Sequence, residues 1–252
     1  YRPAQAAGPL PALVWMHGGG YLIGAPEQDE AQMAELAGDL GLVVVSVDYR
    51  LAPDHPFPAP LDDCAAALRW LLHDAAALGV RPDRVAVGGA SAGAGLAAAL
   101  AQRAHDEGLA VVFQLLVYPM LDDRTVTRAD LNTDEHRIWS QTSNRLGWTA
   151  YLGQPPGAER TPPYAAPARR EGLTGLPPAW IGVGTLDLFH DEDVAYAQRL
   201  TAAGVPTELL VVPGAYHGFD GVQGGAAVSR AFRDAAKDAL RRGLGVVSPV
   251  DR

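Results

Sequence analysis

The chain has 252 residues, enough for one large domain or two small ones, and 48% of them are hydrophobic, which argues against disorder. Its formal net charge of -9 argues against nucleic acid or an anionic membrane as a partner. Cys64 is the only cysteine, so no disulfide can form within the chain, and a cytoplasmic location is expected. No apolar run is long enough to span a bilayer.

Strand-like apolar runs alternate with helical patterns along the chain. The run at 42–47 is rich in Val and is predicted to be a strand buried on both faces. Regular alternation predicts an α/β fold: a mostly parallel sheet with helices on both faces and ligand sites beyond the carboxyl ends of the strands. The expected strands are 12–16, 42–47, 85–88, 111–117, 179–183 and 208–212, and the expected helices are 27–40, 61–78, 94–103, 191–203 and 226–240.

Residues 121–176 break this rhythm, because they contain no strong strand signal. They hold Trp139, Trp148 and Tyr151 on an expected helix, followed by a Pro-rich stretch at 155–167. A long excursion within a compact domain is typical of a functional or lid-like segment. We expect residues 1–252 to form a single domain that carries this lid-like excursion.

The run Gly89-Ala90-Ser91-Ala92-Gly93 lies between an apolar strand and an Ala-rich helix. A Ser on such a turn sits at the tip of a strained elbow with its hydroxyl exposed. Small residues two positions to either side leave room for the crossing backbone. The following helix points its positive end at the Ser, where an oxyanion would form. An ordinary Gly- and Ala-rich turn also explains the pentapeptide alone, but its context favours Ser91 as a nucleophile.

A second motif, His17-Gly18-Gly19-Gly20, follows the first expected strand. Consecutive glycines let backbone N–H groups turn toward one point, where side chains would block a substrate carbonyl oxygen. A flexible turn explains this motif equally well by itself, and a phosphate-binding loop lacks its required Lys-Ser/Thr ending here. We expect His17 to be a structural hydrogen-bonding residue rather than a catalyst.

Two further candidates also follow strands: Asp187 comes after the strand at 179–183, and His217 after the strand at 208–212. The order Ser, Asp, His is the one that the hydrolase elbow fold uses. In such a triad the carboxylate orients the imidazole, which takes the Ser proton and later returns it to the leaving group. Alone, a loop Asp is usually a turn residue and a single His is usually polar surface. Their joint placement favours a triad.

Asp191, Glu192 and Asp193 compete with Asp187 as the acid. They are typical of the first turn of a helix, where acidic side chains are favoured. We therefore expect these three carboxylates to be solvated. No His, Cys and Asp cluster has metal-ligand spacing and no dinucleotide fingerprint is present, so the residues predict neither a metal nor a nucleotide cofactor.

Together, these motifs, the block 49–59 and the run Tyr216-His217-Gly218-Phe219 resemble the hormone-sensitive-lipase family (family IV) of bacterial esterases, over essentially the whole chain. The resemblance implies an α/β-hydrolase fold that cleaves small, short-chain carboxylic esters without a cofactor. It implies that Ser91 is the nucleophile, His217 the base and Asp187 its orienting acid. It also implies that the oxyanion hole consists of backbone N–H groups of Gly18, Gly19 and Ala92.

Three departures from the family pattern stand out. Ala90 replaces the Asp that usually precedes the nucleophile, which changes local polarity without removing a triad member. Asp54 stands where Glu is common in the Pro-rich block. Third, about a dozen residues precede the strand at 12–16, where the family normally has N-terminal cap helices and a first strand pair. Either that segment lies outside the printed sequence, or this is a variant with an open pocket.

Tyr21, Tyr118 and Leu188 fall near the expected strand ends, and Trp148 is placed to cover them. These four are candidate substrate contacts, although core packing is the commoner fate of an aromatic residue. By analogy with the family, the last expected edge strand, at 208–212, is a candidate for pairing with a second copy in a homodimer.

Three functions remain open at this point. The first is a serine carboxylesterase acting on small-molecule esters. The second is an amidase, deacetylase or lactonase, because these activities share the same oxyanion geometry. The third is a non-catalytic binding protein like the family's plant gibberellin receptors, in which the resemblance implies loss of the catalytic base. The presence of Ser91, Asp187 and His217 together argues against the third.

Overall fold

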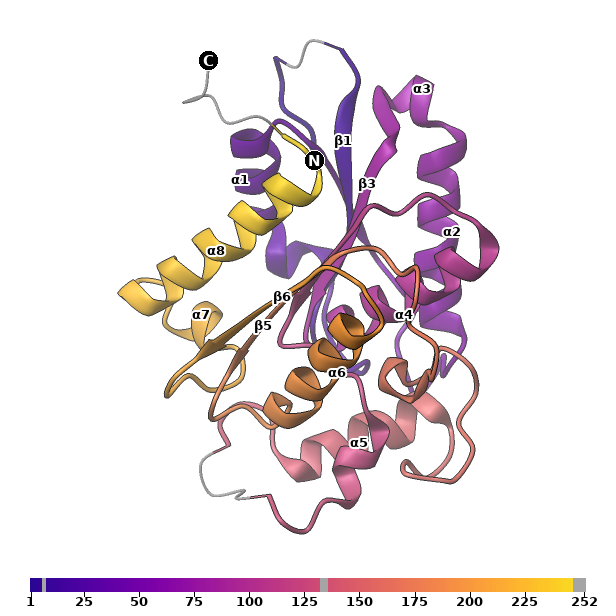
Figure 1. The fold of residues 1–252 in the computed structure, drawn as a ribbon, viewed down its shortest axis with the longest axis vertical. Helices are drawn as coiled ribbons and strands as arrows, with labels where there is room; N and C mark the ends of the chain where they lie inside the picture. Colours follow the sequence, from indigo (N-terminus) through magenta and orange to yellow (C-terminus); the bar gives the residue numbers. More distant parts are fainter. Residues whose placement is uncertain (6–7, 132–135, 247–252) are drawn as a thin grey trace.

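The computed structural model describes residues 1–5, 8–131 and 136–246. In this part of the chain six strands form one sheet in the order β2-β1-β3-β4-β5-β6, and every neighbouring pair is parallel (Figure 1). The expected α/β architecture is therefore confirmed. The strands are β1 (Leu10–Met16), β2 (Val43–Val47), β3 (Val80–Ala90), β4 (Phe113–Val117), β5 (Ala179–Gly184) and β6 (Thr207–Val212).

Helices cover both faces of this sheet (Figure 1). One face carries α2 (Ala59–His73), α4 (Ala92–Glu107) and α6 (His190–Ala202), and the other carries α1 (Glu30–Leu40) and α8 (Ala227–Gly243). Helix α5 (Gln141–Leu152) lies apart from these layers, below the sheet in Figure 1. The short elements are α3 (Ala75–Leu78), α7 (Phe219–Val222) and the 3-10 turns η1 (Pro26–Asp29), η2 (Asp123–Thr127) and η4 (Pro167–Arg169).

Alternation along β1 shows how one strand serves two cores. Val14 and Met16 belong to the core under α2 and α4, whereas Leu13 and Trp15 belong to the core under α1 and α8. A strand in the interior of a parallel sheet is buried on both faces, so all four are apolar. The sequence of α4 follows the same logic, because its Ala and Gly residues are almost all buried and let this central helix lie close to the sheet.

The structure corrects the expectation for 42–47. Strand β2 is at an edge of the described sheet, and Val43 and Val45 are only half-buried. A Val-rich run has the composition of a central strand, but its position in the sheet is decided by topology. The expected helix at 61–78 is also interrupted, since α2 ends before Asp74 and α3 follows it.

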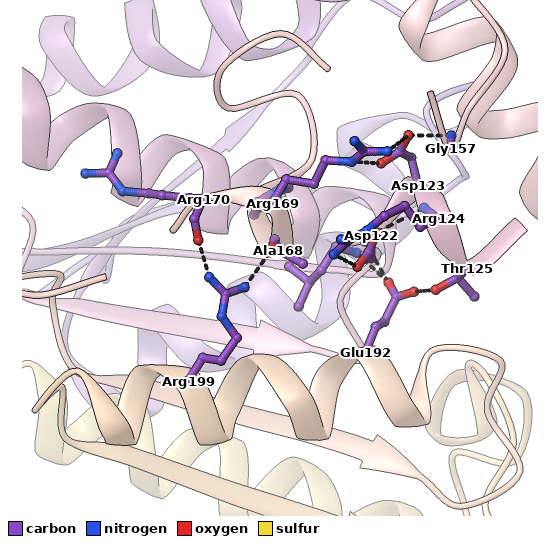
Figure 2. Close-up of polar contacts among 12 residues, drawn as sticks. Asp122, Asp123, Arg124, Thr125, Gly157, Ala168, Arg169, Arg170, Glu192 and Arg199 are labelled. Carbon is purple, nitrogen blue, oxygen red and sulfur yellow. Dashed lines mark hydrogen bonds and ion pairs between the residues drawn. The ribbon is translucent and has the colours of Figure 1, made fainter. Parts of the chain in front are cut away.

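Buried polar contacts tie the excursion at 121–176 to α6 (Figure 2). The carboxylate of Glu192 accepts hydrogen bonds from the N–H groups of Leu121 (2.7 Å) and Asp122 (3.1 Å) and from the hydroxyl of Thr125. About two turns further along α6, Arg199 donates hydrogen bonds to the carbonyl oxygens of Ala168 and Arg170. Within the excursion, Arg169 pairs with the fully buried Asp123, the shortest N–O distance being 2.6 Å. Figure 2 shows these contacts as separate groups: Glu192 and Arg199 reach from α6 to the excursion, and Arg169 and Asp123 pair within it.

Candidate active site

The side chains of Ser91, His217 and Asp187 form one chain of hydrogen bonds. Nε2 of His217 lies 2.9 Å from Oγ of Ser91, and Nδ1 of His217 lies 2.8 Å from Oδ2 of Asp187. The other carboxylate oxygen of Asp187 accepts a hydrogen bond of 2.9 Å from the N–H of Phe189. This is the geometry in which an acid fixes an imidazole so that its second nitrogen faces a hydroxyl.

The backbone of Ser91 is strained as the elbow motif predicts, with φ 55° and ψ -121° between β3 and α4. The small neighbours are required by the crossing. A Cβ at Gly93 would collide with the carbonyl oxygens of Met16 and His17, and one at Gly89 would lie 2.6 Å from that of Met16. The need for small residues at both positions is thus confirmed by the packing.

Gly18 lies directly against the elbow, because a Cβ on Gly18 would be 3.2 Å from the carbonyl oxygen of Ala90 and 3.5 Å from Cβ of Ser91. Gly19, with φ 129°, continues this loop. Ala92 is the first residue of α4, where backbone N–H groups have no partner within the helix. The fold therefore places Gly18 against the Ser91 elbow, with Gly19 next in the same loop and Ala92 next to Ser91 in the chain. Their service as oxyanion donors stays a prediction.

His17 is fully buried beneath this loop. Its Nδ1 lies 2.8 Å from the carbonyl oxygen of Gly18, and its ring stacks on Tyr49 with centroids 4.3 Å apart. The hydroxyl of Tyr49 donates to the carbonyl oxygen of His17 over 2.7 Å. These contacts are those of a structural residue that holds the turn, as expected.

The four candidate pocket residues are all buried. Tyr118 touches the triad, because its ring lies 4.8 Å from that of His217. Leu188 follows Asp187 and lines a small cavity beside it. Tyr21 and Trp148 pack against each other, with ring centroids 5.6 Å apart. Tyr118 and Leu188 thus lie beside the triad, and contact of any of the four with substrate stays a prediction.

Two residues beside the triad were missed from the sequence. The ring of Phe189 meets that of His217 edge-on at 5.2 Å, so the imidazole is held between Phe189 and Tyr118. Asp220 accepts a hydrogen bond of 3.0 Å from the hydroxyl of Tyr118. The available signals were their positions, two residues after Asp187 and three after His217.

The expectation that the acids of α6 are solvated is wrong for two of them. Asp191 is exposed, but Glu192 and Asp193 are only 8% and 0% exposed. Burial raises the pKa of both carboxyls well above the ordinary range. Glu192 is fully hydrogen-bonded, whereas neither oxygen of Asp193 has a partner among the described residues. Asp193 was misassigned because it occupies a first turn and also the buried face of the same helix.

The chain is similar to known esterases over most of its length. It is 40% identical over 224 residues to the carboxylesterase NlhH of Mycobacterium tuberculosis, which covers 87% of this chain and 69% of that protein. It is 36% identical to an ethyl acetate hydrolase of Pseudomonas putida, covering 87% of this chain and 70% of that protein. Among solved structures, a bacterial heroin esterase superposes with a TM-score of 0.92 at 43% identity, covering 96% of this chain and 78% of the other.

Within the described residues, no helix combines the length and the apolar character needed to cross a membrane. A sequence model of the alpha/beta hydrolase fold matches residues 13–221. The resemblance first drawn from the motifs is thereby confirmed, and the chain belongs to the α/β-hydrolases of the hormone-sensitive-lipase family.

Proposed function

We propose that this protein is a serine carboxylesterase that cleaves short-chain carboxylic esters through an acyl-enzyme. The observation that carries the proposal is the continuous hydrogen-bond chain from Ser91 through His217 to Asp187. A non-catalytic binding protein on this scaffold has no need for an imidazole aligned on a strained, buried hydroxyl. The names of the relatives, a carboxylesterase and an ethyl acetate hydrolase among them, support an ester as the substrate.

In the first half of the proposed reaction, Oγ of Ser91 attacks the ester carbonyl carbon while Nε2 of His217 accepts the hydroxyl proton. The carbonyl oxygen becomes an oxyanion, held by the N–H groups of Gly18, Gly19 and Ala92. Asp187 stabilises the imidazolium that forms. The intermediate collapses when His217 gives its proton to the departing alkoxide, which leaves as the alcohol.

In the second half, a water molecule takes the place of the alcohol. His217 removes one proton from this water as it attacks the carbonyl carbon of the acyl-Ser91, and the same oxyanion site holds the second tetrahedral intermediate. Return of the proton to Oγ of Ser91 releases the carboxylic acid. Every proton transfer uses one nitrogen, so the reaction needs no metal or organic cofactor.

Four further features of the protein are proposed, each from one observation. Small esters are favoured because the relatives include a hydrolase of ethyl acetate. Residues 1–252 are proposed to act as one domain, because a single sheet carries all three triad residues. A homodimer through β6 is proposed because β6 is an edge of the described sheet. A cytoplasmic location is proposed from the single, buried Cys64.

The test compares wild type with Ser91→Ala on p-nitrophenyl acetate and butyrate and on a matched anilide. We expect wild type to hydrolyse the esters far faster than the anilide, and Ser91→Ala to lose about 10⁴-fold or more in kcat. A fluorophosphonate probe should label wild type and leave Ser91→Ala unlabelled. Wild-type turnover in the Ser91→Ala variant contradicts the proposal, and a preference for the anilide converts it to an amidase.

A further inference from the structure

The face of α5 packs on the loop that follows His17, and two glycines make the contact. Gly147, a buried residue in the interior of α5, faces the backbone of Gly20. A Cβ built on Gly147 would lie 2.9 Å from the carbonyl oxygen of Gly20 and 3.3 Å from Cζ2 of Trp139. A Cβ on Gly20 would collide with the indole of Trp139. The two backbones and one indole therefore fill this space completely.

Glycine inside a helix costs about 1 kcal/mol relative to alanine, so its use needs a reason in the packing. At position 147 that reason is the close approach of Gly20. The backbone before Trp139 is strained, because Ile138 has φ 67°, a conformation that β-branched residues rarely adopt. Nε1 of Trp139 donates to Oδ1 of the buried Asn144 on α5 over 3.2 Å.

Hydrogen bonds and a ring contact tie the backbone around Gly20 to its neighbours. The carbonyl oxygen of Gly19 accepts hydrogen bonds from the N–H groups of Leu22 (3.0 Å) and Ile23 (3.1 Å), which closes residues 19–23 into a tight turn. Tyr21 in this turn is stacked on Tyr151 of α5, with ring centroids 3.9 Å apart. We expect a shift of the Gly20 backbone relative to α5 to displace the peptide between Gly19 and Gly20, and through Cα of Gly19 the preceding peptide, which carries the N–H of Gly19.

We propose that Gly147, together with Trp139, is a positioning residue that sets the distance between the oxyanion loop and Ser91. The inference rests on the proposed function, because the loop has a catalytic task only in an acyl-transfer enzyme. In this view α5 supports the catalytic geometry from behind the loop, without any contact between Gly147 and substrate. It gives the excursion at 121–176 a role in kcat.

Gly147→Ala tests this with the smallest available change, and Gly38→Ala is its matched control. Gly38 lies in α1, and a Cβ built there meets nothing within 4 Å. Both substitutions improve helix propensity. We expect Gly147→Ala to lower kcat for p-nitrophenyl acetate about tenfold with KM changed less than about twofold, since oxyanion binding acts on the transition state. Gly38→Ala should keep kcat within about twofold of wild type.

A second readout separates positioning from a general structural effect. The Ser91 hydroxyl adds to the carbonyl carbon of a trifluoromethyl ketone and gives its proton to His217, which leaves an oxyanion in the hole. The inhibition constant of the ketone should therefore rise by the same factor as kcat falls in Gly147→Ala. Trp139→Phe places a smaller ring over Gly20. This variant should also lower kcat and raise the inhibition constant of the ketone. It tests the proposal alone if Gly147→Ala does not fold.

The outcomes separate a failure of the proposed function from a failure of the positioning role. If wild type hydrolyses no ester, the proposed function fails first. If wild type is an active esterase while Gly147→Ala and Trp139→Phe match Gly38→Ala in kcat and in ketone inhibition, the positioning role alone is overturned. A rise in KM at unchanged kcat overturns it too, because that result places Gly147 in substrate binding.

Discussion

Asp187 lies in the turn before α6 and Asp193 in the first turn of α6, and both are buried. Their surroundings nevertheless differ in kind. Asp187 has one oxygen on Nδ1 of His217 and the other on the N–H of Phe189. Neither oxygen of Asp193 has a hydrogen-bond partner in the described part of the chain. Burial and the nearby carboxylates of Glu192 and Asp187 raise its pKa well above the ordinary value. The pair shows that two buried acids this close in sequence can differ entirely in their hydrogen-bond partners.

Glu192 sits between these two cases. It is buried like Asp193, but three donors reach it, two of them backbone N–H groups at the start of the excursion. Its role is therefore structural: it joins α6, which follows the loop that carries Asp187, to the segment after β4. Met120 in that segment donates its N–H to the carbonyl of Ser91 over 3.1 Å. A carboxylate that never meets substrate thus connects two parts of the triad scaffold.

The largest effect is expected from Asp187→Asn. An amide can still accept the hydrogen bond from Phe189, but it presents the wrong group to Nδ1 of His217, so the imidazole adopts the wrong tautomer. We expect kcat to fall about 10⁴-fold while the fold is retained. Steady-state kinetics with a thermal unfolding scan checks this. A loss of less than about tenfold contradicts the assignment of Asp187 as the acid of the triad and makes Glu192 and Asp193 the next residues to test.

Glu192→Ala should mainly lower stability. It leaves the N–H groups of Leu121 and Asp122 without their buried acceptor, at a cost of about 2–4 kcal/mol in the free energy of unfolding. Glu192→Gln should recover part of this, because its carbonyl oxygen replaces one acceptor and the Thr125 hydroxyl can reverse its hydrogen bond. Urea unfolding measures both variants. Equal stability of Glu192→Ala and wild type would show that the hydrogen bonds of Glu192 contribute nothing.

The sequence carried more information about the acids than the prediction used. Asp193 shares a helix face with Phe189, Tyr196 and Leu200, at the spacing of a buried stripe. The burial of Asp193 could therefore be predicted from this spacing. The preference for acidic residues in the first turn of a helix led to the opposite prediction. The absence of partners was not readable, because the groups that could reach it come from other elements.

The same difference, between what one element's own pattern shows and what depends on neighbouring elements, holds for the rest of the site. Ser91, Asp187 and His217 were predictable, because each follows a strand and parallel strands end at one edge. The edge position of β2 and the contact of Gly147 with Gly20 depend on which elements lie side by side, and no local pattern encodes that. Sequence periodicity gave the elements, whereas their neighbours came from the three-dimensional arrangement.

Asp193→Asn sharpens the comparison through pH. A carboxyl whose pKa is raised by folding stabilises the folded state least at high pH, because the unfolded chain gives up the proton more readily. Wild type should therefore lose stability as the pH rises above about 4, the ordinary pKa of Asp. We expect Asp193→Asn to be more stable by on the order of 1–2 kcal/mol at pH 8, with the difference shrinking toward pH 4. Urea titrations at pH 4, 6 and 8 measure the difference, and a constant offset contradicts a raised pKa of Asp193 in the folded protein.

Asp106→Asn should give the smallest effect and the opposite slope. Asp106 lies on the surface, where Arg170 donates to both of its oxygens (2.6 and 2.8 Å) and Tyr164 donates over 2.8 Å. These contacts, with Arg170 first, lower its pKa to about 2. Folding thus favours the charged form, so the stabilisation is present at neutral pH and disappears as the pH falls through about 2.

Because its side chain is 34% exposed, solvent and salt screen this pair. We expect Asp106→Asn to cost less than about 1 kcal/mol at pH 7, and less still in 1 M salt. Urea unfolding in parallel with Asp193→Asn checks the sign. Stability differences that move in the same direction with pH for both variants would contradict the contrast between a paired acid and an unpaired one.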